Sequence, residues 1–454
     1  MKVLLINPVI REWAKPNVLP LGLAYIAAVL RDNGHLVEVL DLNALRLKSG
    51  EIEARLRKSD YDVAGIGAIV TVYREVKRLI QQLKSFHPER PVMVGGSVGT
   101  SIPHIIMEKT AADIACIGEG EVTALEIVSS LERKEALEKV AGIWFKQPDG
   151  HIIKNPPRKP IRSMDTLPLP AWDLFPMEIY LVNPVGAPNR NKWVDGDSGE
   201  EFVRSMNVSA TRGCPYKCIY CYHDFMGQGY RFRSPENIVA EIEALFERYG
   251  VEYIHFMDDE FCMRKDFVME FCRLFKARFD GKVTWGCAGR VNLMTEDLIR
   301  TMADSGCVII GYGIESGSQK MLDAMKKQVT VAQAKQALRW TQKYTEWPAC
   351  SFMIGTPGET RETIQETIDF CKELDLAPEV IFFMTAYPGT ELYEKAMEEG
   401  KIPDEEAYIL DLGEQGEKIR INFTDLPDNE LYRIQEDMIA ELKAWNKMKH
   451  PESN

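Results

Sequence analysis

Residues 211–221 read TRGCPYKCIYC and place Cys214, Cys218 and Cys221 on one short loop, with the spacing C-x3-C-x2-C. The loop follows MNVSAT at residues 206–211, a run that is typical of a strand. In a parallel barrel the catalytic groups sit at the carboxyl ends of the strands, so this position favours a catalytic role for the loop. Three thiolates this close together can hold a metal centre.

The ligand set favours an iron–sulfur cluster over a zinc ion. A structural zinc site normally has four protein ligands and a catalytic one usually includes histidine, and only His223 lies near enough in sequence to complete such a site. Iron–sulfur clusters take cysteinyl sulfur, and three cysteines on a four-iron cluster leave one iron open to a substrate or cofactor. Zinc and a chance grouping of the cysteines remain the alternatives.

The chain beyond the loop repeats a strand-and-helix pattern. Strands are expected at MNVSAT, YIHFMD, VTWGCA, VIIGYGI, ACSFMIG and VIFFMTA, and helices at about 235–249, 265–279, 295–305, 318–325 with 332–343, and 360–374. Six such repeats predict an incomplete parallel barrel, because the closed form has eight. The acidic part from about Gly400 ends in a predicted helix at Asp428–Lys449 and is a candidate cap for the barrel.

The chain before the loop shows a second alternation of strands and helices. Apolar strand-like runs begin at Lys2, Leu36, Asp62, Pro91 and Asp113, with helical patterns between them. This order predicts a doubly wound parallel sheet covered by helices on both faces, whose ligands bind at the carboxyl ends of the strands. Glycines gather at those ends, in Gly65-Ile66-Gly67, Gly95-Gly96-Ser97 with Gly99, and Gly118-Glu119-Gly120. None of them forms G-x-G-x-x-G after the first strand, so a conventional dinucleotide site is not supported.

The periodicity fades between the two alternating series, where prolines and polar residues accumulate. The chain therefore divides into a doubly wound, Rossmann-like domain (1–140), a linker with a short hairpin near Ile143–Ile153 and a wrapping loop (141–204), a partial TIM-type (β/α)6 barrel (205–400) and a helical C-terminal region (401–454). The fold class is α/β.

Composition places the chain among ordinary globular proteins: 45% of its 454 residues are hydrophobic and 27% are charged. Its net charge of -13 disfavours a nucleic-acid binder. No run approaches the length of a membrane span, and the start MKVLLINPVIREW lacks a cationic leader. Ten cysteines without an export signal indicate a reducing, cytoplasmic location, in which the seven cysteines outside the loop are packing residues.

The loop resembles the signature of the radical S-adenosylmethionine (SAM) enzymes, C-x3-C-x-aromatic-C, in Cys214, Cys218, Tyr220 and Cys221, and the resemblance extends from about Met206 to Gly400. It implies that the three cysteines hold a [4Fe–4S] cluster whose fourth iron is chelated by SAM. The reduced cluster then cleaves SAM to a 5′-deoxyadenosyl radical. An external one-electron reductant, such as flavodoxin or ferredoxin, is implied as the partner.

The resemblance also assigns SAM contacts to other strand ends. Asp258, Asp259 and Glu260 stand where the family binds the amino group, with two aspartates in place of the frequent Gly-Gly; the alternative is a helix N-cap. Arg290 and Glu315 would hold the carboxylate and ribose, or form a buried ion pair. The remaining expected contacts are an adenine turn at Ile354, Gly355 and Pro357, and the closing turn Tyr387-Pro388-Gly389-Thr390.

The first domain is similar to the cobalamin-binding domain of one subgroup of these enzymes. The implied contacts are the glycine turns and a loop against the lower face of the corrin: Gly95, Gly96, Ser97, Gly118, Glu119, Gly120, Ile69, Val70 and Thr71. The cobalt-ligating motif D-x-H-x-x-G is absent, and neither His35 nor His104 stands in such a context. We therefore expect cobalamin without a histidine on cobalt, above an apolar face formed by residues such as Ile69, Val70 or Val72.

Together the resemblances imply an anaerobic, cobalamin-dependent radical SAM enzyme that methylates an unactivated carbon of a small molecule. The alternative keeps both cofactors but performs cyclisation, rearrangement or oxidation, as enzymes resembling the anaerobic magnesium-porphyrin cyclase do. A non-enzymatic electron carrier or structural metal protein is a third possibility, but the cluster of a carrier usually has every iron ligated by the protein. The sequence does not identify the substrate, whose specificity we place in pocket shape and the irregular segment 183–203.

Overall fold

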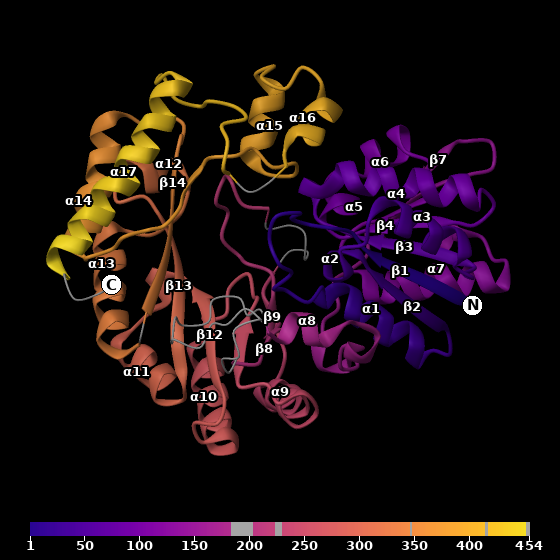
Figure 1. Cartoon of the computed structure of the whole chain (residues 1–454), viewed down its shortest axis with the longest axis horizontal. Coiled ribbons are helices and arrows are strands. Elements are labelled where there is room, and N and C mark those ends of the chain that lie inside the picture. The colour runs from indigo at the N-terminus through magenta and orange to yellow at the C-terminus, as the bar shows by residue number, and fades with distance from the viewer. Residues whose placement is uncertain (183–202, 223–228, 346, 414–415, 451–454) are drawn as a thin grey trace. The chain divides into compact units, whose positions relative to one another are not determined.

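The computed structural model describes residues 1–182, 203–222, 229–345, 347–413 and 416–450, so His223 and nearly all of the segment 183–203 lie outside the described residues. Within this part, the chain divides into two compact units (Figure 1). The first unit takes its residues from 1–185, 224–233 and 402–414, and the second from 186–223, 234–401 and 415–454.

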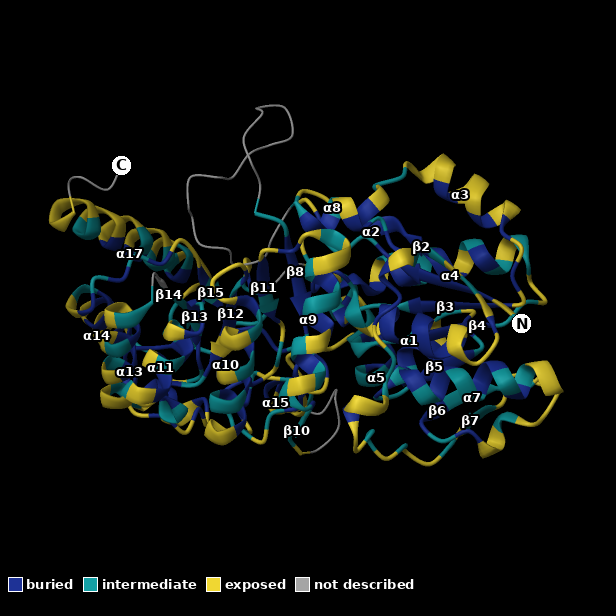
Figure 2. Ribbon diagram, turned by 90° about the horizontal axis from the view of Figure 1, so that it is seen from below, coloured by how far each residue is buried: buried dark blue, intermediate teal, exposed yellow. Residues whose placement is uncertain are grey.

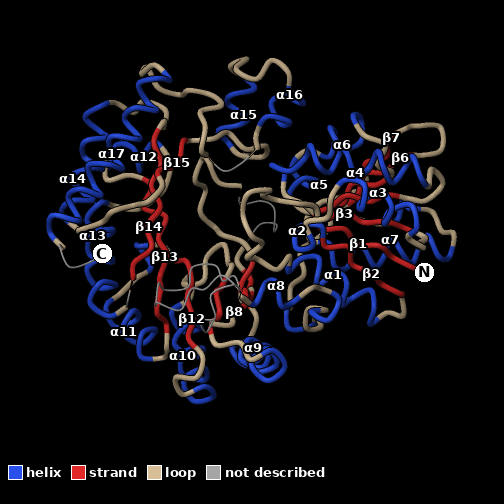
Figure 3. The backbone as a smooth tube through the Cα atoms, viewed as in Figure 1, coloured by secondary structure: helices blue, strands red, loops and turns tan. Residues whose placement is uncertain are grey.

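The first unit is built on a seven-stranded sheet with the order β2-β1-β3-β4-β5-β6-β7 (Figure 3). Strands β1 to β5 pair in parallel, and β6 and β7 add antiparallel. The bounds are β1 Lys2–Asn7, β2 Leu36–Asp41, β3 Val63–Gly67, β4 Val92–Gly95, β5 Ile114–Cys116, β6 Ile143–Lys146 and β7 Ile152–Lys154. The order 2-1-3-4-5 belongs to doubly wound folds, so the predicted class is confirmed. The hairpin expected near Ile143–Ile153 extends this sheet and is not a free linker.

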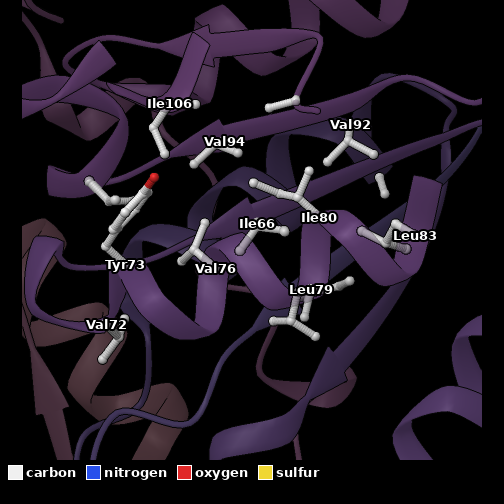
Figure 4. Packing of buried hydrophobic residues seen from close by; sticks show 14 of the residues in the cluster. Ile66, Val72, Tyr73, Val76, Leu79, Ile80, Leu83, Val92, Val94 and Ile106 are labelled. Atoms are coloured by element: carbon white, nitrogen blue, oxygen red, sulfur yellow. The ribbon is translucent and has the colours of Figure 1, made fainter. Parts of the chain in front are cut away.

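Helices cover both faces of the first sheet. They are α1 Leu21–Asp32, α2 Leu42–Leu45, α3 Ser49–Lys58, α4 Tyr73–Phe86, α5 Ser97–Ser101, α6 Pro103–Lys109, α7 Gly120–Arg133 and, from the Pro-rich segment, α8 Met177–Leu181. Helix α4 repeats apolar residues at helical spacing, Val76, Leu79, Ile80 and Leu83, and all four are buried. Figure 4 shows these side chains among Ile66, Val92 and Val94 of the sheet. Each buried aliphatic side chain contributes about 1.5–3 kcal/mol, which fixes α4 and the loop before it.

The second unit contains a six-stranded, all-parallel sheet in the order β15-β14-β13-β12-β11-β8 (Figure 1). Its strands are β8 Ser205–Val208, β11 Tyr253–Phe256, β12 Thr284–Gly289, β13 Cys307–Glu315, β14 Trp347–Ile354 and β15 Ile381–Phe383. The alternating helices are α9 Pro235–Tyr249, α10 Lys265–Phe279, α11 Glu296–Asp304, α12 Gln319–Ala324, α13 Val331–Tyr344 and α14 Arg361–Glu373, followed by α15 Glu391–Glu398 and α17 Asp428–Lys449. The sheet curls without closing, which confirms the incomplete barrel. The short strands β9 Thr211–Arg212 and β10 Arg231–Phe232 lie outside both main sheets.

An aromatic core supports one corner of this sheet. Phe256 at the end of β11 and Phe261 five residues later stack with their ring centres 4.5 Å apart, and both contact Trp285 of β12 and Phe271 of α10. Such pairs contribute about 0.5–1.5 kcal/mol beyond the burial of their area. The stacked rings fix both ends of the loop that carries Asp258, Asp259 and Glu260. Figure 2 shows that most of the strand positions are buried and that most of the exposed positions are on helices and loops.

The acidic C-terminal part, expected to form one region over 401–454, is shared between the units. Helix α16, Glu405–Asp411, belongs to the first unit, where Ile409 is buried in the core that contains α4. Tyr73 and Lys77 of α4 donate hydrogen bonds to Glu406 at 2.7 and 2.6 Å. Helix α17 instead packs along α14 in the second unit, with Leu431, Met438 and Leu442 buried. The division has a physical reason: α16 buries Ile409 in the first unit, whereas α17 buries its apolar residues in the second.

Among the described residues, no helix combines the length and the apolar character needed to cross a membrane.

Candidate active site

The cysteine loop begins where β8 ends, and two aspartates from the end of β11 hold its start. Asp258 Oδ1 accepts hydrogen bonds from the backbone N–H groups of Ala210 and Thr211, at 2.8 and 2.5 Å. Asp259 Oδ2 accepts one from the N–H of Gly213, at 2.9 Å. Burial raises the pKa of Asp258 to about 7, and its Oδ2 is enclosed without a hydrogen-bond partner among the described residues. The structure thus places Asp258 and Asp259 beside the loop, as anchors of its backbone.

The three loop cysteines are gathered on one turn. Cys218 is buried, Cys214 is half-buried and Cys221 is exposed, and the N–H of Cys221 donates to the carbonyl of Cys218 at 3.1 Å. Although the Cys221 residue as a whole is exposed, protein surrounds its thiol, and this burial, followed by the neighbouring Cys218, Asp259 and Cys214, raises the pKa of Cys221 to about 12. Binding iron would deprotonate such thiols.

The three loop cysteines supply the sulfur ligands that an iron–sulfur cluster takes. Nowhere in the described part of the chain do three Cys, His, Asp or Glu side chains converge as ligands of one metal ion. A zinc ion needs its ligands within bonding distance of one centre, whereas a cubane cluster spreads three sulfurs over three different irons. The loop therefore fits a [4Fe–4S] cluster, and the zinc alternative would need His223, which lies outside the described residues.

A buried polar group lies against the loop on one side. Tyr220 Oη donates to Glu315 Oε1 at 3.1 Å, and Lys327 Nζ donates to the same two oxygens at 3.0 Å each. The side chains of Lys327 and Glu315 are each 9% exposed. Burial and the Glu315 carboxylate raise the pKa of Tyr220 well above its ordinary value. Tyr220 and Glu315, both predicted site residues, are thus brought together at the end of β13.

Lys327 is the residue of this group that sequence reasoning missed. It lies in the turn between α12 and α13, flanked by Lys326 and Gln328, whose φ angles are +53° and +56°. Glu315 also has a positive φ, +68°. Backbone of this kind costs about 1–3 kcal/mol per residue and persists where surrounding contacts over-determine it, frequently at functional sites. In sequence, a lysine in a polar turn gives no signal that distinguishes it from a surface residue.

Arg290, at the end of β12, reaches the cysteine loop rather than Glu315. Its Nη1 donates to Cys218 Sγ at 3.7 Å, and its Nη2 donates to the carbonyl of Lys327. The guanidinium carbon lies 3.6 Å from the ring centre of Tyr216, whose hydroxyl accepts a hydrogen bond from Asn292 at 2.9 Å. The alternative for Arg290 and Glu315, an ion pair between them, is not what the structure has, because Glu315 pairs with Lys327.

Buried carboxylates shape two more strand ends. Glu359 Oε2 accepts the N–H groups of Gly355 and Thr356 at 2.5 and 3.1 Å, and burial raises its pKa to about 7. This holds the expected adenine turn, in which Ile354 is buried, Pro357 is half-buried and Gly355 has a φ of +89°. Glu260 behaves similarly after β11: it is buried, its Oε1 accepts the N–H of Cys262, and burial raises its pKa to about 7.

The closing turn Tyr387–Thr390 lies against the other side of the cysteine loop. A Cβ atom on Gly389 would stand 2.2 Å from the ring of Tyr222, and the N–H of Leu392 donates to the carbonyl of Ile219 at 2.9 Å. The carboxyl edge of the second sheet therefore gathers the predicted residues from six strand ends.

The glycine turns of the first unit also meet at one sheet edge. Ala68 donates to the carbonyl of Gly95 at 3.1 Å, and Val70 donates its N–H to Ser97 Oγ at 3.0 Å. Gly96 has φ +84°, and a Cβ there would stand 2.3 Å from the carbonyl oxygen of Ala68. Gly118, with φ +78°, has open space where a Cβ would lie. The edge thus combines tightly joined loops with backbone that a ligand can approach, which fits a bulky corrin.

The residues predicted at this edge differ in their exposure and in their existing hydrogen bonds. Ile69 is 40% exposed and Thr71 is half-buried, whereas Val70 and Val72 belong to the core of the unit. The Glu119 carboxylate accepts hydrogen bonds from Arg231 Nη1 at 2.7 Å and from the N–H of Ile161 at 2.6 Å. Gly120 begins α7 beside this carboxylate.

Both histidines considered for cobalt have protein partners. His35 lies at the amino end of β2, opposite the glycine edge, with its Nδ1 3.2 Å from the N-terminal amine. His104 Nε2 lies 3.0 Å from both carboxylate oxygens of Glu405. That neither histidine binds cobalt stays a prediction.

Comparisons with known proteins match both units. The Radical SAM superfamily model matches residues 208–371, and the B12 binding domain model matches residues 9–128. An uncharacterised methyltransferase of Pyrococcus horikoshii is 31% identical over 406 residues, which cover 87% of this chain and 83% of that protein. The anaerobic magnesium-protoporphyrin IX monomethyl ester cyclase of Rubrivivax gelatinosus is 26% identical over 446 residues, covering 93% of this chain and 77% of that protein.

A solved structure supports the fold. The radical SAM methyltransferase TsrM from Kitasatospora setae, with cobalamin and a [4Fe–4S] cluster bound, matches with a TM-score of 0.70 over 88% of this chain and 75% of that chain, at 20% identity. The protein is thus an enzyme whose cofactors are a [4Fe–4S] cluster, SAM and cobalamin. Its identity to the Pyrococcus protein over most of both chains, together with the two domain matches, shows that the chain belongs to the radical SAM superfamily and carries a B12 binding domain.

Proposed function

We propose that the enzyme transfers a methyl group from SAM, by way of cobalamin, to an unactivated carbon of a small molecule. The observation that carries the proposal is the presence of two cofactor edges on one chain: a cysteine loop with three ligands and a glycine edge without a histidine. The Pyrococcus relative is a methyltransferase by name, which supports the reaction class.

The bound groups supply a methyl carrier on cobalt and a 5′-deoxyadenosyl radical that removes a substrate hydrogen atom. Cys214, Cys218 and Cys221 hold the cluster. Asp258, Asp259, Glu260, Glu315 and the turn Ile354–Pro357 form the shell of SAM, whose charged groups need paired partners in a dry cavity. The glycine edge and Ile69, with Thr71, Ser97 and the backbone at Glu119, would bind the corrin.

The residues of this chain bind, orient and exclude water. Asp258 and Asp259 fix the cysteine loop through its backbone, which would keep the three thiols in place as cluster ligands. Tyr220 and Glu315 are held by Lys327, which orients the Glu315 carboxylate toward a SAM hydroxyl. A one-electron donor such as flavodoxin or ferredoxin reduces the cluster.

A second candidate retains both cofactors but closes a ring or oxidises its substrate. Its specific support is the similarity to the Rubrivivax cyclase, which extends over 93% of this chain. The two candidates differ in the product, because methylation adds one methylene to the mass and cyclisation does not.

Isotope transfer tests the proposal. Anaerobically reconstituted protein with SAM deuterated on its methyl group should pass the label to cobalamin, and reduction should yield 5′-deoxyadenosine. Small-molecule extracts incubated with the enzyme should then contain one product heavier by the labelled methyl group. In the matched control, Cys218→Ala, 5′-deoxyadenosine should disappear while cobalamin stays bound. A product without label, formed together with 5′-deoxyadenosine, would favour the cyclase-type reaction.

A further inference from the structure

We propose that Arg290 sets the reduction potential of the cluster by donating a hydrogen bond to Cys218, and that Lys327 is the positioning residue that holds Arg290 there. The inference rests on the cluster held by Cys214, Cys218 and Cys221, and not on the methyl transfer. It gives Arg290 a role different from holding the SAM carboxylate.

The contacts of Arg290 already engage every nitrogen of its guanidinium. Nη1 donates to Cys218 Sγ at 3.7 Å, Nη2 donates to the carbonyl of Lys327, and Nε lies 3.4 Å from Asn292 Oδ1. One face of the group is covered by the ring of Tyr216. This geometry directs the cation at a cluster ligand and fixes it from three sides.

A cation in this position favours the reduced cluster. Reduction adds one electron, supplied by the external reductant, and increases the negative charge on the cluster and its thiolates. Hydrogen bonds to cluster sulfurs stabilise that charge, and net charge and solvent exposure are further determinants of the potential. Cys218 is the buried cysteine of the three, where the effective dielectric is lower and the interaction stronger.

Lys327 connects this cation to the rest of the site. Its carbonyl accepts from Arg290, while its ammonium group donates to Glu315 and Tyr220 at 3.0 Å. The positive φ angles of Lys326 and Gln328 on either side show that the turn adopts a costly conformation. The nearby carbonyl of Met325 accepts a hydrogen bond from the N–H of Ile219 at 3.1 Å, so the same turn also binds the backbone of the cysteine loop. Changing Lys327 should therefore displace Arg290 from Cys218.

The test is a redox titration of the reconstituted protein without SAM, monitored by the paramagnetic resonance of the reduced cluster. For Arg290→Met, we expect about a tenfold lower ratio of reduced to oxidised cluster at a fixed potential, which is about 59 mV for a one-electron couple. The matched control is Arg273→Met, which removes the same charge from an exposed site on α10 where the arginine pairs with Glu270. Its titration should coincide with that of the wild type.

Two further variants keep the proposal testable where Arg290→Met does not retain its cluster. Arg290→Lys keeps the positive charge but loses the forked guanidinium, so the reduction potential of its cluster should fall by less than in Arg290→Met. Lys327→Met should lower the potential in the same direction through Arg290. An unchanged midpoint in all variants that hold a cluster overturns the proposal. Weaker SAM binding with an unchanged midpoint would assign Arg290 to the SAM carboxylate instead.

These outcomes are separable from those for the proposed function. Wild-type protein that shows the cluster titration but never labels cobalamin would contradict methyl transfer alone. Wild-type protein that binds no cluster would overturn the present inference.

Discussion

Lys327 and Glu315 form a buried ion pair at the carboxyl end of β13, with Nζ and Oε1 3.0 Å apart and both side chains 9% exposed. Removing one partner of such a pair leaves an uncompensated buried charge, which costs about 3–5 kcal/mol. Lys327→Met should therefore lower the free energy of unfolding by that amount in urea titrations. The double variant Lys327→Met with Glu315→Gln should recover part of the loss because the charge is gone. An equal loss of unfolding free energy in the single and the double variant would show that the pair is solvated.

The cluster prediction concerns the three loop cysteines. Wild-type protein reconstituted anaerobically should carry about four irons, as a cubane cluster requires. Replacing Cys214, Cys218 and Cys221 by Ala should abolish this iron and SAM cleavage. Cys371→Ala, which changes a buried cysteine of α14, is the control and should retain the iron. Full iron content in the triple variant would contradict the assignment.

A pH prediction follows from Glu359. Burial raises its pKa in the fold from 4.5 to about 7, so the folded state binds more protons than the unfolded chain between these values. Stability from this group is then complete below about pH 4.5 and is lost as the pH rises to about 7, by roughly 3 kcal/mol. Glu359→Gln removes the ionisation and keeps an oxygen for the N–H groups of Gly355 and Thr356. The free energy of unfolding of Glu359→Gln should increase relative to that of the wild type as the pH rises. Parallel curves of unfolding free energy against pH, from pH 4.5 to 8, would refute this.

The glycine edge is tested by Gly96→Ala. With φ +84° and ψ -165°, this position is in a region that only glycine adopts readily, and a Cβ would overlap the carbonyl of Ala68. We expect a loss of about 2 kcal/mol or more in unfolding experiments and poorer retention of cobalamin after desalting. Gly50→Ala in α3, where nothing lies within 4 Å of the added atom, is the control and should be neutral or stabilising. Unchanged retention of cobalamin in Gly96→Ala would show that the turn at Gly96 does not contribute to cofactor binding.

The last prediction is that neither His35 nor His104 binds cobalt. His35 and His104 are engaged by the N-terminal amine and Glu405. In the cobalt(II) protein, any nitrogen superhyperfine splitting should therefore persist in the His35→Ala/His104→Ala variant. Loss of the splitting in that variant, with cobalamin still bound, would identify a protein ligand.

Periodicity was sufficient to predict the parallel strands of both sheets because each is an apolar run separated from the next by helical sequence. It could not reveal α3, whose ten residues bury only Ile52 and Leu56, or α16, in which Ile409 alone is buried. Helices with so few apolar residues become visible only when the surface that covers them is known.

The site was predictable where chemistry requires a residue type at a strand end, as for the cysteines, Tyr220 and Glu315. It was not predictable where a contact depends on how two loops meet. Asp258 and Asp259 were predicted as SAM contacts or a helix N-cap, and the structure adds that they bind the backbone of the cysteine loop. Lys327 enters the site only because an unusual turn directs it inward.

The location of α16 has a consequence for biosynthesis. Because residues 402–414 belong to the first unit, its core lacks Ile409 while only residues 1–185 have left the ribosome. Ile409 and the partner of Tyr73 and Lys77 emerge after the whole parallel barrel has been translated. Until then, the apolar surface of the first unit that packs against Ile409 stays uncovered. A gene fragment that stops after the first 185 codons would encode a domain lacking a piece of its own interior.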